Sequence, residues 1–126
     1  MNTFSPALLD FIAERHLATL VTQRADGSPH AVPVGFTMHQ GNVRVITFST
    51  SVKAKNAARG GRASVTQLDG ARWVTLEGSV RLLTDAASVS DAVDAYARRY
   101  RPPKVRVDRV VVEIEVDRVL CNGGLK

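Results

Sequence analysis

From Val43 to Arg62 the chain reads VRVITFSTSVKAKNAARGGR, a run that indicates a strand followed by a helix. Residues 43–48 have the β-branched and aromatic side chains typical of strands. Ser49-Thr50-Ser51 breaks the strand, and a short helix over 52–59 follows and ends at Gly60-Gly61. This helix and Arg62 carry four basic residues and no acid. Because the first N–H groups of a helix lack partners, lysines beside them make a natural place for a phosphate or carboxylate.

The residues before this stretch predict a helix and a hairpin. Ser5-Pro6 is typical of a helix start, and the apolar stripe after it predicts a helix over 6–15. Asp26-Gly27 predicts a tight turn between strands at 17–22 and 31–38. Pro33 interrupts the return strand. Because proline lacks an N–H, this position should face an edge, a bulge or a ligand.

The residues after this stretch predict three more strands and a second amphipathic helix. Asp69-Gly70 predicts another tight turn, and Gly78 a bulge or bend. A helix capped by Thr84 or Asp85 is expected before Pro102-Pro103. The expected strands span 62–68, 72–83 and 110–116. A small, mostly antiparallel barrel follows, since closing the sheet removes its exposed edges.

Length and composition bound the class of protein. The 126 residues predict a single domain over 1–126, with a core at about 5–120 and a loose tail at 121–126. A formal net charge of +5 favours anionic partners. The lone Cys121 excludes an intrachain disulfide and favours the cytoplasm. We see no signal peptide and no run of membrane-spanning length, so no membrane association is expected.

Several kinds of chemistry find no support in the residues. His16, His30 and His39 lack metal-ligand spacing, so no metal site is expected. There is no nucleophile elbow and no glycine-rich phosphate loop. Nucleic-acid binding is disfavoured, because aromatic residues make up only 6% of the chain and none lies in the basic helix to stack on bases.

Two features leave their interpretation open. Lys53 and Asn56 are expected on one side of the basic helix and Lys55, Arg59 and Arg62 on the other, which suits either a ligand site or a solvated basic surface.

Trp73 beside Arg72 suits a core aromatic or a ring packed on a cofactor, with the arginine reaching an anion. The interruption at Pro33-Val34-Gly35 would leave backbone groups free for the edge of a heterocycle.

Together these segments resemble a known superfamily. They are 16–22, Asp26-Gly27-Ser28-Pro29-His30, 33–36, 53–57, 69–78 and 96–101. The chain is similar to the pyridoxamine 5′-phosphate oxidase-like proteins, over about residues 5–120. Within them it most resembles the actinobacterial flavin/deazaflavin oxidoreductases that use coenzyme F-420, of the biliverdin reductase type. This resemblance implies a mainly β fold, the FMN-binding split β-barrel, antiparallel and Greek-key-like, with a few short helices.

The resemblance also implies a homodimer with two cofactor sites at the subunit interface. Lys53 and Asn56 match the family positions that hold the cofactor phosphate, and Thr50 and Ser51 would add contacts. Some relatives have an arginine where Ser51 stands, so phosphate binding in this chain would depend more on Lys53 and Lys55. Two strand segments, 32–36 with Pro33 and Val34 and 46–48, would line the ring, and Trp73 would approach the cofactor tail from the partner subunit.

The implied reaction is a hydride transfer from reduced coenzyme F-420 to a conjugated anionic small molecule, biliverdin being the first candidate. Substrate carboxylates would need cations, for which Arg24, Arg44, Arg72 and the 98–104 segment are candidates. No catalytic proton donor is evident. Two alternatives stay open: an FMN-dependent oxidase-like or flavin reductase-like enzyme of the same barrel, and a non-catalytic cofactor-binding protein.

Overall fold

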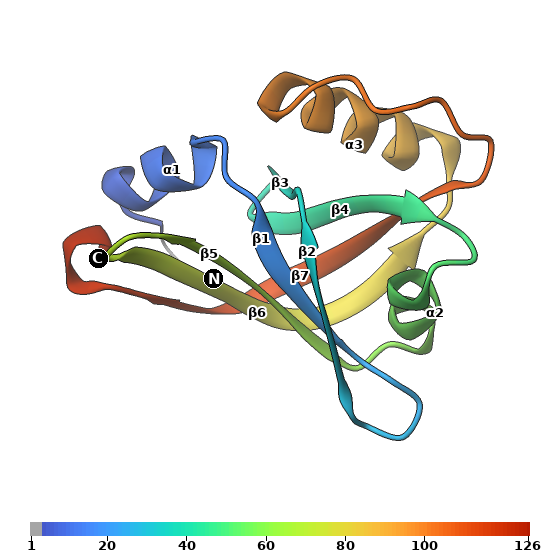
Figure 1. Ribbon diagram of the computed structural model, residues 1–126, viewed down its shortest axis with the longest axis horizontal. Helices are drawn as coiled ribbons and strands as arrows, with labels where there is room; N and C mark the ends of the chain where they lie inside the picture. The colour runs from blue at the N-terminus through green and yellow to red at the C-terminus, as the bar shows by residue number, and fades with distance from the viewer. Residues whose placement is uncertain (1–3) are drawn as a thin grey trace.

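The computed structural model describes residues 4–126, and these form one seven-stranded antiparallel sheet with three α-helices and a terminal 3₁₀ turn (Figure 1). In chain order the elements are α1 (Pro6–Ala13), β1 (Ala18–Gln23), β2 (Pro29–Val34), β3 (Thr37–His39), β4 (Asn42–Phe48), α2 (Val52–Arg59), β5 (Arg62–Asp69), β6 (Arg72–Leu83), α3 (Ala86–Arg99), β7 (Arg109–Cys121) and η1 (Gly123–Leu125). The expected mainly β architecture with a few short helices is confirmed.

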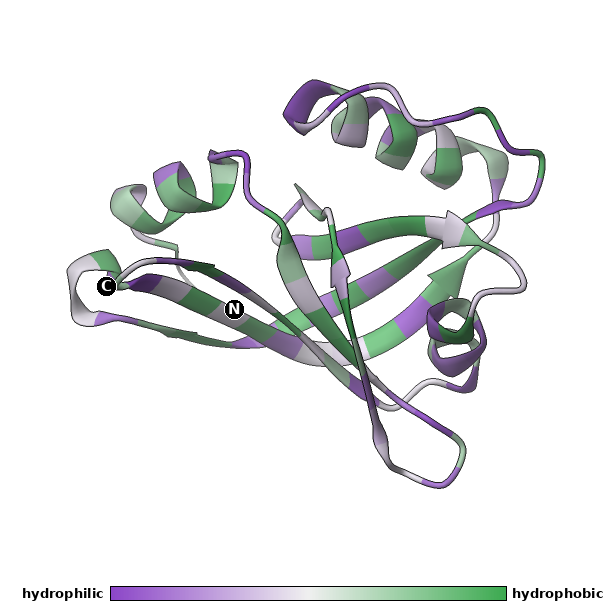
Figure 2. Cartoon of the chain, viewed as in Figure 1, coloured by the Kyte–Doolittle hydropathy of each residue, from purple (hydrophilic) through white to green (hydrophobic). Residues whose placement is uncertain are grey.

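The sheet closes on itself as a split barrel. Its strand order is β2-β1-β5-β6-β7-β4-β3, so β2 and β3 lie at its two ends. Only Gly35 and Phe36 separate these two strands in the chain. Because two residues span only a few ångströms, the sheet must curl until its ends meet. Green and purple alternate along the strands in Figure 2, and the apolar side chains fill the inside of this curl.

The split is the gap in pairing between the two ends. β2 pairs with β1 alone, and β3 pairs only with Asn42, Val43 and Arg44 of β4. The remainder of β4 pairs with β7 on its other side. The outer edges of β2 and of residues 45–48 of β4 thus lack a strand neighbour. This is how the predicted return strand over 31–38 differs from the structure: it breaks at Gly35 into two strands on opposite edges.

The helices begin and end where the sequence provides caps. Ser51 accepts a hydrogen bond from the Ala54 N–H at the start of α2, and Asp85 does the same for the Ser88 N–H of α3. Gly60 and Gly61 have φ of 81° and 93° and stop α2, since such angles suit only glycine readily. The register shift between Glu77 and Gly78 is the expected bulge.

The chain ends differ from expectation. The helix expected over 6–15 ends at Ala13, and the last strand continues beyond 116 to Cys121, because β7 follows β6 to its start. The tail expected to be loose forms η1. Its Leu125 is buried, and the Leu125 carbonyl accepts a 2.6 Å hydrogen bond from Ser5 Oγ.

Candidate cofactor cleft

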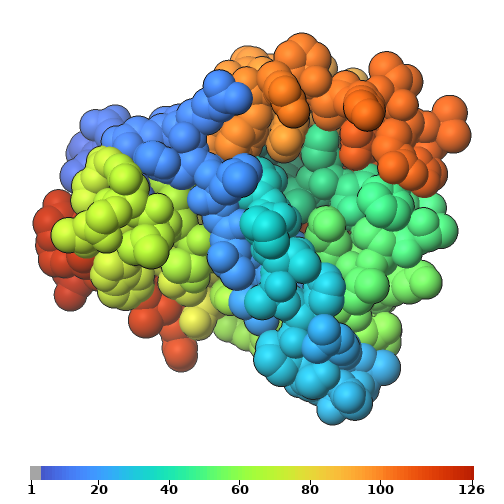
Figure 3. Space-filling model, viewed as in Figure 1, coloured from blue at the N-terminus to red at the C-terminus, as the bar shows by residue number. Residues whose placement is uncertain are grey.

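A cleft of about 190 Å³ lies at the split of the barrel. Figure 3 shows the surface hollowed between the β1–β2 hairpin and the green β4–α2 segment, beneath α3 and the orange chain that follows it. The side chains and backbone that line the cleft belong to Pro33, Val34, Gly35, Val45, Ile46, Lys53, Tyr96, Pro103 and Arg109. The structure thus brings together Pro33, Val34 and Lys53, three of the residues expected at a cofactor site.

Lys53 supplies the positive charge of the cleft. It is half-buried on the first turn of α2, and burial lowers the pKa of its ammonium group. Within residues 4–126 it forms no ion pair with a carboxylate. A partly desolvated cation without a counter-ion favours an anionic ligand, because the ligand replaces the lost hydration.

Neighbouring residues of α2 have different environments. Lys55 and Thr50 are exposed, so both can approach a ligand from solvent. Ser51 is buried, and its Oγ accepts from the Ala54 N–H and from Thr47 Oγ1 at 2.9 Å. Its hydroxyl therefore holds the helix start in place.

Asn56 faces the barrel interior and is only 3% exposed. Its Nδ2 donates to Thr22 Oγ1 at 3.0 Å, and its Oδ1 accepts from Arg59. Arg59 was expected on the opposite side of the helix from Asn56. Its side chain instead contacts Asn56 one turn earlier, because residues three apart are neighbours on a helix. Both ends of the Asn56 amide are engaged, and Asn56 does not line the cleft beside Lys53.

Two tyrosines to which the sequence assigned no role at the site, Tyr96 on α3 and Tyr100 directly after it, pack at one side of the cleft. Tyr96 lines the cleft, and its ring lies 4.9 Å from that of Tyr100. A Cβ at Gly35 would come within 2.9 Å of both rings, so only glycine lets α3 approach this closely. The Tyr100 hydroxyl donates to the His16 carbonyl at 2.7 Å. The apolar periodicity of α3 was the available signal for these contacts.

His30 on β2 lies within electrostatic reach of Lys53. Burial lowers the pKa of its imidazole, and the charges of Arg24 and Lys53 lower it further. Its Nδ1 is buried without a hydrogen-bond partner. Both effects disfavour the protonated form of this imidazole.

Arg72 and Trp73 lie away from the cleft, at the start of β6. Figure 1 shows this end of the sheet beside α1 and the C-terminus, opposite α2. The Arg72 guanidinium donates to both carboxylate oxygens of Glu14, at 2.7 and 2.8 Å, and to Asp69. It also lies 4.6 Å from the centre of the Phe11 ring. This arginine is engaged within its own subunit.

Trp73 lines a separate surface pocket together with Leu8, Val119 and Leu125. The backbone N–H of Trp73 donates to Asn122 Oδ1 at 2.8 Å. Within one chain it does not meet Lys53.

Arg44, another of the arginines expected near a substrate, is a buried residue of β4. Its Nε donates to Glu113 Oε2 at 2.8 Å. Burial alone would raise the pKa of Glu113, but hydrogen bonds from Arg44 and Arg81 outweigh it and lower that pKa. Arg44 does not line the cleft.

The sequence predicted no metal site at the histidines. The structure does bring one of them, His16, together with Glu14 and Asp69, and the possible ligand atoms of these three residues lie within 4.8 Å of one another. Arg72 contacts both carboxylates of this group.

None of the helices within residues 4–126 has the length and apolarity to cross a membrane.

Comparisons with known proteins show the family and the fold of this chain. A relative from Mycobacterium tuberculosis (strain CDC 1551 / Oshkosh), named F-420H(2)-dependent biliverdin reductase, is 50% identical over 119 residues, covering 93% of this chain and 87% of that protein.

Solved structures share the fold. The crystal structure of a conserved hypothetical protein from Mycobacterium tuberculosis superposes with a TM-score of 0.81 at 25% identity, covering 94% of this chain and 84% of that one. A structure named F-420 reductase gives a TM-score of 0.73 at 18% identity over 88% of this chain and 94% of that one, which is evidence of fold alone. The family model described as Pyridoxamine 5′-phosphate oxidase matches residues 4–121. The chain therefore belongs to the pyridoxamine 5′-phosphate oxidase family, as the resemblance predicted, and its fold is the split β-barrel of that family.

Proposed function

We propose that this protein is an oxidoreductase that uses reduced coenzyme F-420 to reduce a conjugated anionic small molecule, with biliverdin as the first substrate to test. The observation that carries the proposal is the half-buried Lys53, unpaired among residues 4–126, in a cleft between two free strand edges. The 50% identical relative named as an F-420H(2)-dependent biliverdin reductase supports both the coenzyme and the substrate.

The cleft suits a phosphorylated, flat cofactor. Lys53 holds the phosphate, while Lys55 and Thr50 add contacts from the exposed side of α2. Ser51 and Asn56 position α2 without contacting the cofactor. Ser51 caps the start of the helix, and Asn56 fastens the helix to Thr22 of β1. The backbone edges at Pro33-Val34 and at 45–48 hydrogen-bond to the ring edge, because the N–H and C=O groups on the outer side of these strands lack strand partners. Pro33 has no N–H to offer there.

Bound there, the reduced coenzyme supplies a hydride, and a proton completes the two-electron reduction of the substrate. The protein positions the ring between β2 and β4 and restricts water with Tyr96 and Pro103, which line the cleft. Substrate carboxylates contact Arg109, the second cation of the cleft.

We propose a cytoplasmic homodimer as the working form. Trp73 lies at the end of the sheet opposite Lys53, so a partner subunit is needed to bring it to a cofactor tail. Leu68, opposite Trp73 in the β5–β6 pair, is 64% exposed, and the nearby Leu120 is 40% exposed. Apolar side chains of this kind favour association. A molar mass from light scattering tests the dimer.

The test of function is a fluorescence titration of the purified protein with coenzyme F-420 and, separately, with FMN. We expect saturable binding of coenzyme F-420, weaker binding of FMN, and loss of biliverdin absorbance when reduced coenzyme is supplied. Preference for FMN would favour an oxidase-like or flavin reductase-like enzyme of the same barrel. Coenzyme binding without turnover of biliverdin would favour another substrate or a cofactor carrier.

A further inference from the structure

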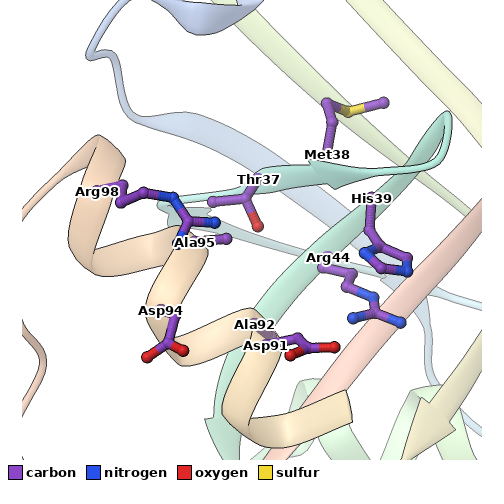
Figure 4. A pocket seen from close by; sticks show the side chains of 9 residues that line it. All are labelled: Thr37, Met38, His39, Arg44, Asp91, Ala92, Asp94, Ala95 and Arg98. Atoms are coloured by element: carbon purple, nitrogen blue, oxygen red, sulfur yellow. The ribbon is translucent and has the colours of Figure 1, made fainter. Parts of the chain in front are cut away.

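A second pocket lies between α3 and the β3–β4 hairpin (Figure 4). Its volume is about 200 Å³, and it shares no lining residue with the cofactor cleft. Since a water molecule in the liquid occupies about 30 Å³, the pocket has room for a small molecule. Its polar and charged lining residues are Thr37, His39, Arg44, Asp91, Asp94 and Arg98.

The floor of this pocket holds a hydrogen-bond donor that lacks an acceptor. The side chain of Arg44 is 8% exposed and its Nη1 is buried without a partner. Glu113, whose side chain is 1% exposed, accepts from the Arg44 Nε at 2.8 Å and fixes the guanidinium. Figure 4 shows the guanidinium turned towards the wall that carries Asp91. A buried donor with nothing to bind is unfavourable, so this atom favours a ligand with a negative oxygen.

The walls of the pocket carry both signs of charge. Asp91 and Asp94 are exposed on α3, and Arg98 follows Asp94 by one helical turn. A simple anion on Arg44 would lie near the Asp91 carboxylate, and a simple cation at Asp91 would lie near the Arg44 guanidinium. A ligand that carries a carboxylate and an ammonium group avoids both conflicts, because each end faces the opposite charge.

We propose that this pocket binds a small zwitterion, its carboxylate on Arg44 Nη1 and the Thr37 hydroxyl and its ammonium group on Asp91. Free α-amino acids are the simplest molecules of this class. The ion pair with Glu113 positions Arg44. Binding here is independent of coenzyme F-420, since the two sites share no residue.

The experiment is an NMR titration of the ¹⁵N-labelled full chain at constant ionic strength. The probes are glycine and L-alanine as zwitterions, acetate as the anion alone and methylamine as the cation alone. We expect saturable shifts of backbone amides in 37–39 and 91–95 with the two amino acids, and at least about tenfold weaker binding of acetate and methylamine, which each lose one charged contact.

Three variants locate the site. Arg44→Lys keeps a positive partner for Glu113 but removes the guanidinium, and we expect it to abolish the shifts. Asp91→Asn changes an exposed residue and should bring amino-acid binding down to the level of acetate. Arg81→Lys is the matched control: Arg81 also contacts Glu113, but it does not line the pocket, so binding should be unchanged.

Two results would overturn the proposal. Absence of saturable shifts in the wild-type chain with either amino acid would mean that the pocket holds only water. Equal affinity for acetate and L-alanine would mean a simple anion site, in which the carboxylates of α3 have no part. Neither result bears on the coenzyme, whose binding is measured separately in the cleft.

Discussion

The two ends of the barrel each offer a cation that the sequence marked for an anionic ligand, and their surroundings differ. At the α2 end, Lys53 lies half-buried in the cleft without a carboxylate partner in the described chain. At the α1 end, Arg72 contacts Glu14, Asp69 and the face of the Phe11 ring. The first cation is available to a ligand, and the second is part of the fold.

This difference indicates that the surroundings of a basic residue, and not its charge alone, decide whether it is available to a ligand. Burial lowers the pKa of Lys53 and no acid compensates. Hydrogen bonds from Arg72 and then His16 lower the pKa of Glu14 to about 2, so the carboxylate stays charged and holds the arginine. Four predictions test this contrast.

The largest effect is expected from Lys53→Ala. Loss of a hydrogen bond to a charged group should weaken binding of coenzyme F-420 by about 1.5–3 kcal/mol. This corresponds to roughly a 10- to 150-fold rise in Kd, read from the fluorescence titration. The thermal midpoint should not fall, because the variant removes a desolvated charge. Lys55→Ala is the matched control, because Lys55 is exposed on the same helix, and its effect on the Kd should be smaller. An unchanged affinity in Lys53→Ala would remove the proposed phosphate site.

Asn56→Ala should act mainly on stability. The variant leaves buried Thr22 Oγ1 and Arg59 without their amide partner, and the free energy of unfolding should fall by about 1–3 kcal/mol. Urea unfolding measures this change. If coenzyme affinity instead falls while stability is unaltered, Asn56 contacts the phosphate directly and the contrast with Lys53 disappears.

Arg72→Ala should show the reverse pattern to Lys53→Ala. We expect a thermal midpoint lower by a few degrees and an unaltered affinity for coenzyme F-420, since the guanidinium is engaged within its own subunit. Exposed ion pairs contribute little each, so the loss is modest. Arg72→Lys keeps the charge but loses the paired hydrogen bonds to Glu14. Its thermal midpoint should therefore lie between those of the wild type and Arg72→Ala. Weaker coenzyme binding in both variants would place Arg72 in the site after all.

The smallest effect is the pH dependence of the α1 end. The pKa of Glu14 is about 2 in the folded chain against an ordinary 4.5. Because the folded pKa is the lower one, its contribution to stability is complete above pH 4.5 and is lost as the pH falls towards 2. The difference in thermal midpoint between wild type and Glu14→Gln should therefore shrink from pH 6 to pH 3. A difference that is constant with pH would show that the Glu14 carboxylate does not hold Arg72.

Local signals predicted most of the elements. The helix over 52–59 matches α2, because Ser51 caps its start and Gly60 and Gly61 end it at positive φ. The strand over 72–83 matches β6, with the bulge at Gly78. In each case the responsible contacts lie within a few residues, where composition and spacing can be read.

Elements shaped by distant partners were harder to predict. The break at Gly35 depends on packing of Tyr96 and Tyr100 from α3. The extension of β7 to Cys121 depends on β6, and the order of the tail depends on the bond from Ser5 to Leu125. The apolar pattern of α3 predicts a buried face, but no local pattern shows which distant residues such a face packs against.

The sequence by itself determined most of the strands and turns and the basic helix, because these depend on side-chain type and spacing over short ranges. Its resemblance to known proteins also indicated the family. The tertiary structure alone decided which basic side chains form ion pairs with acids. Arg72 meets Glu14 across 58 positions and Arg44 meets Glu113 across 69, whereas Lys53 meets no acid within the described chain. Charge pairing depends on distance in space, and only the closed barrel sets those distances.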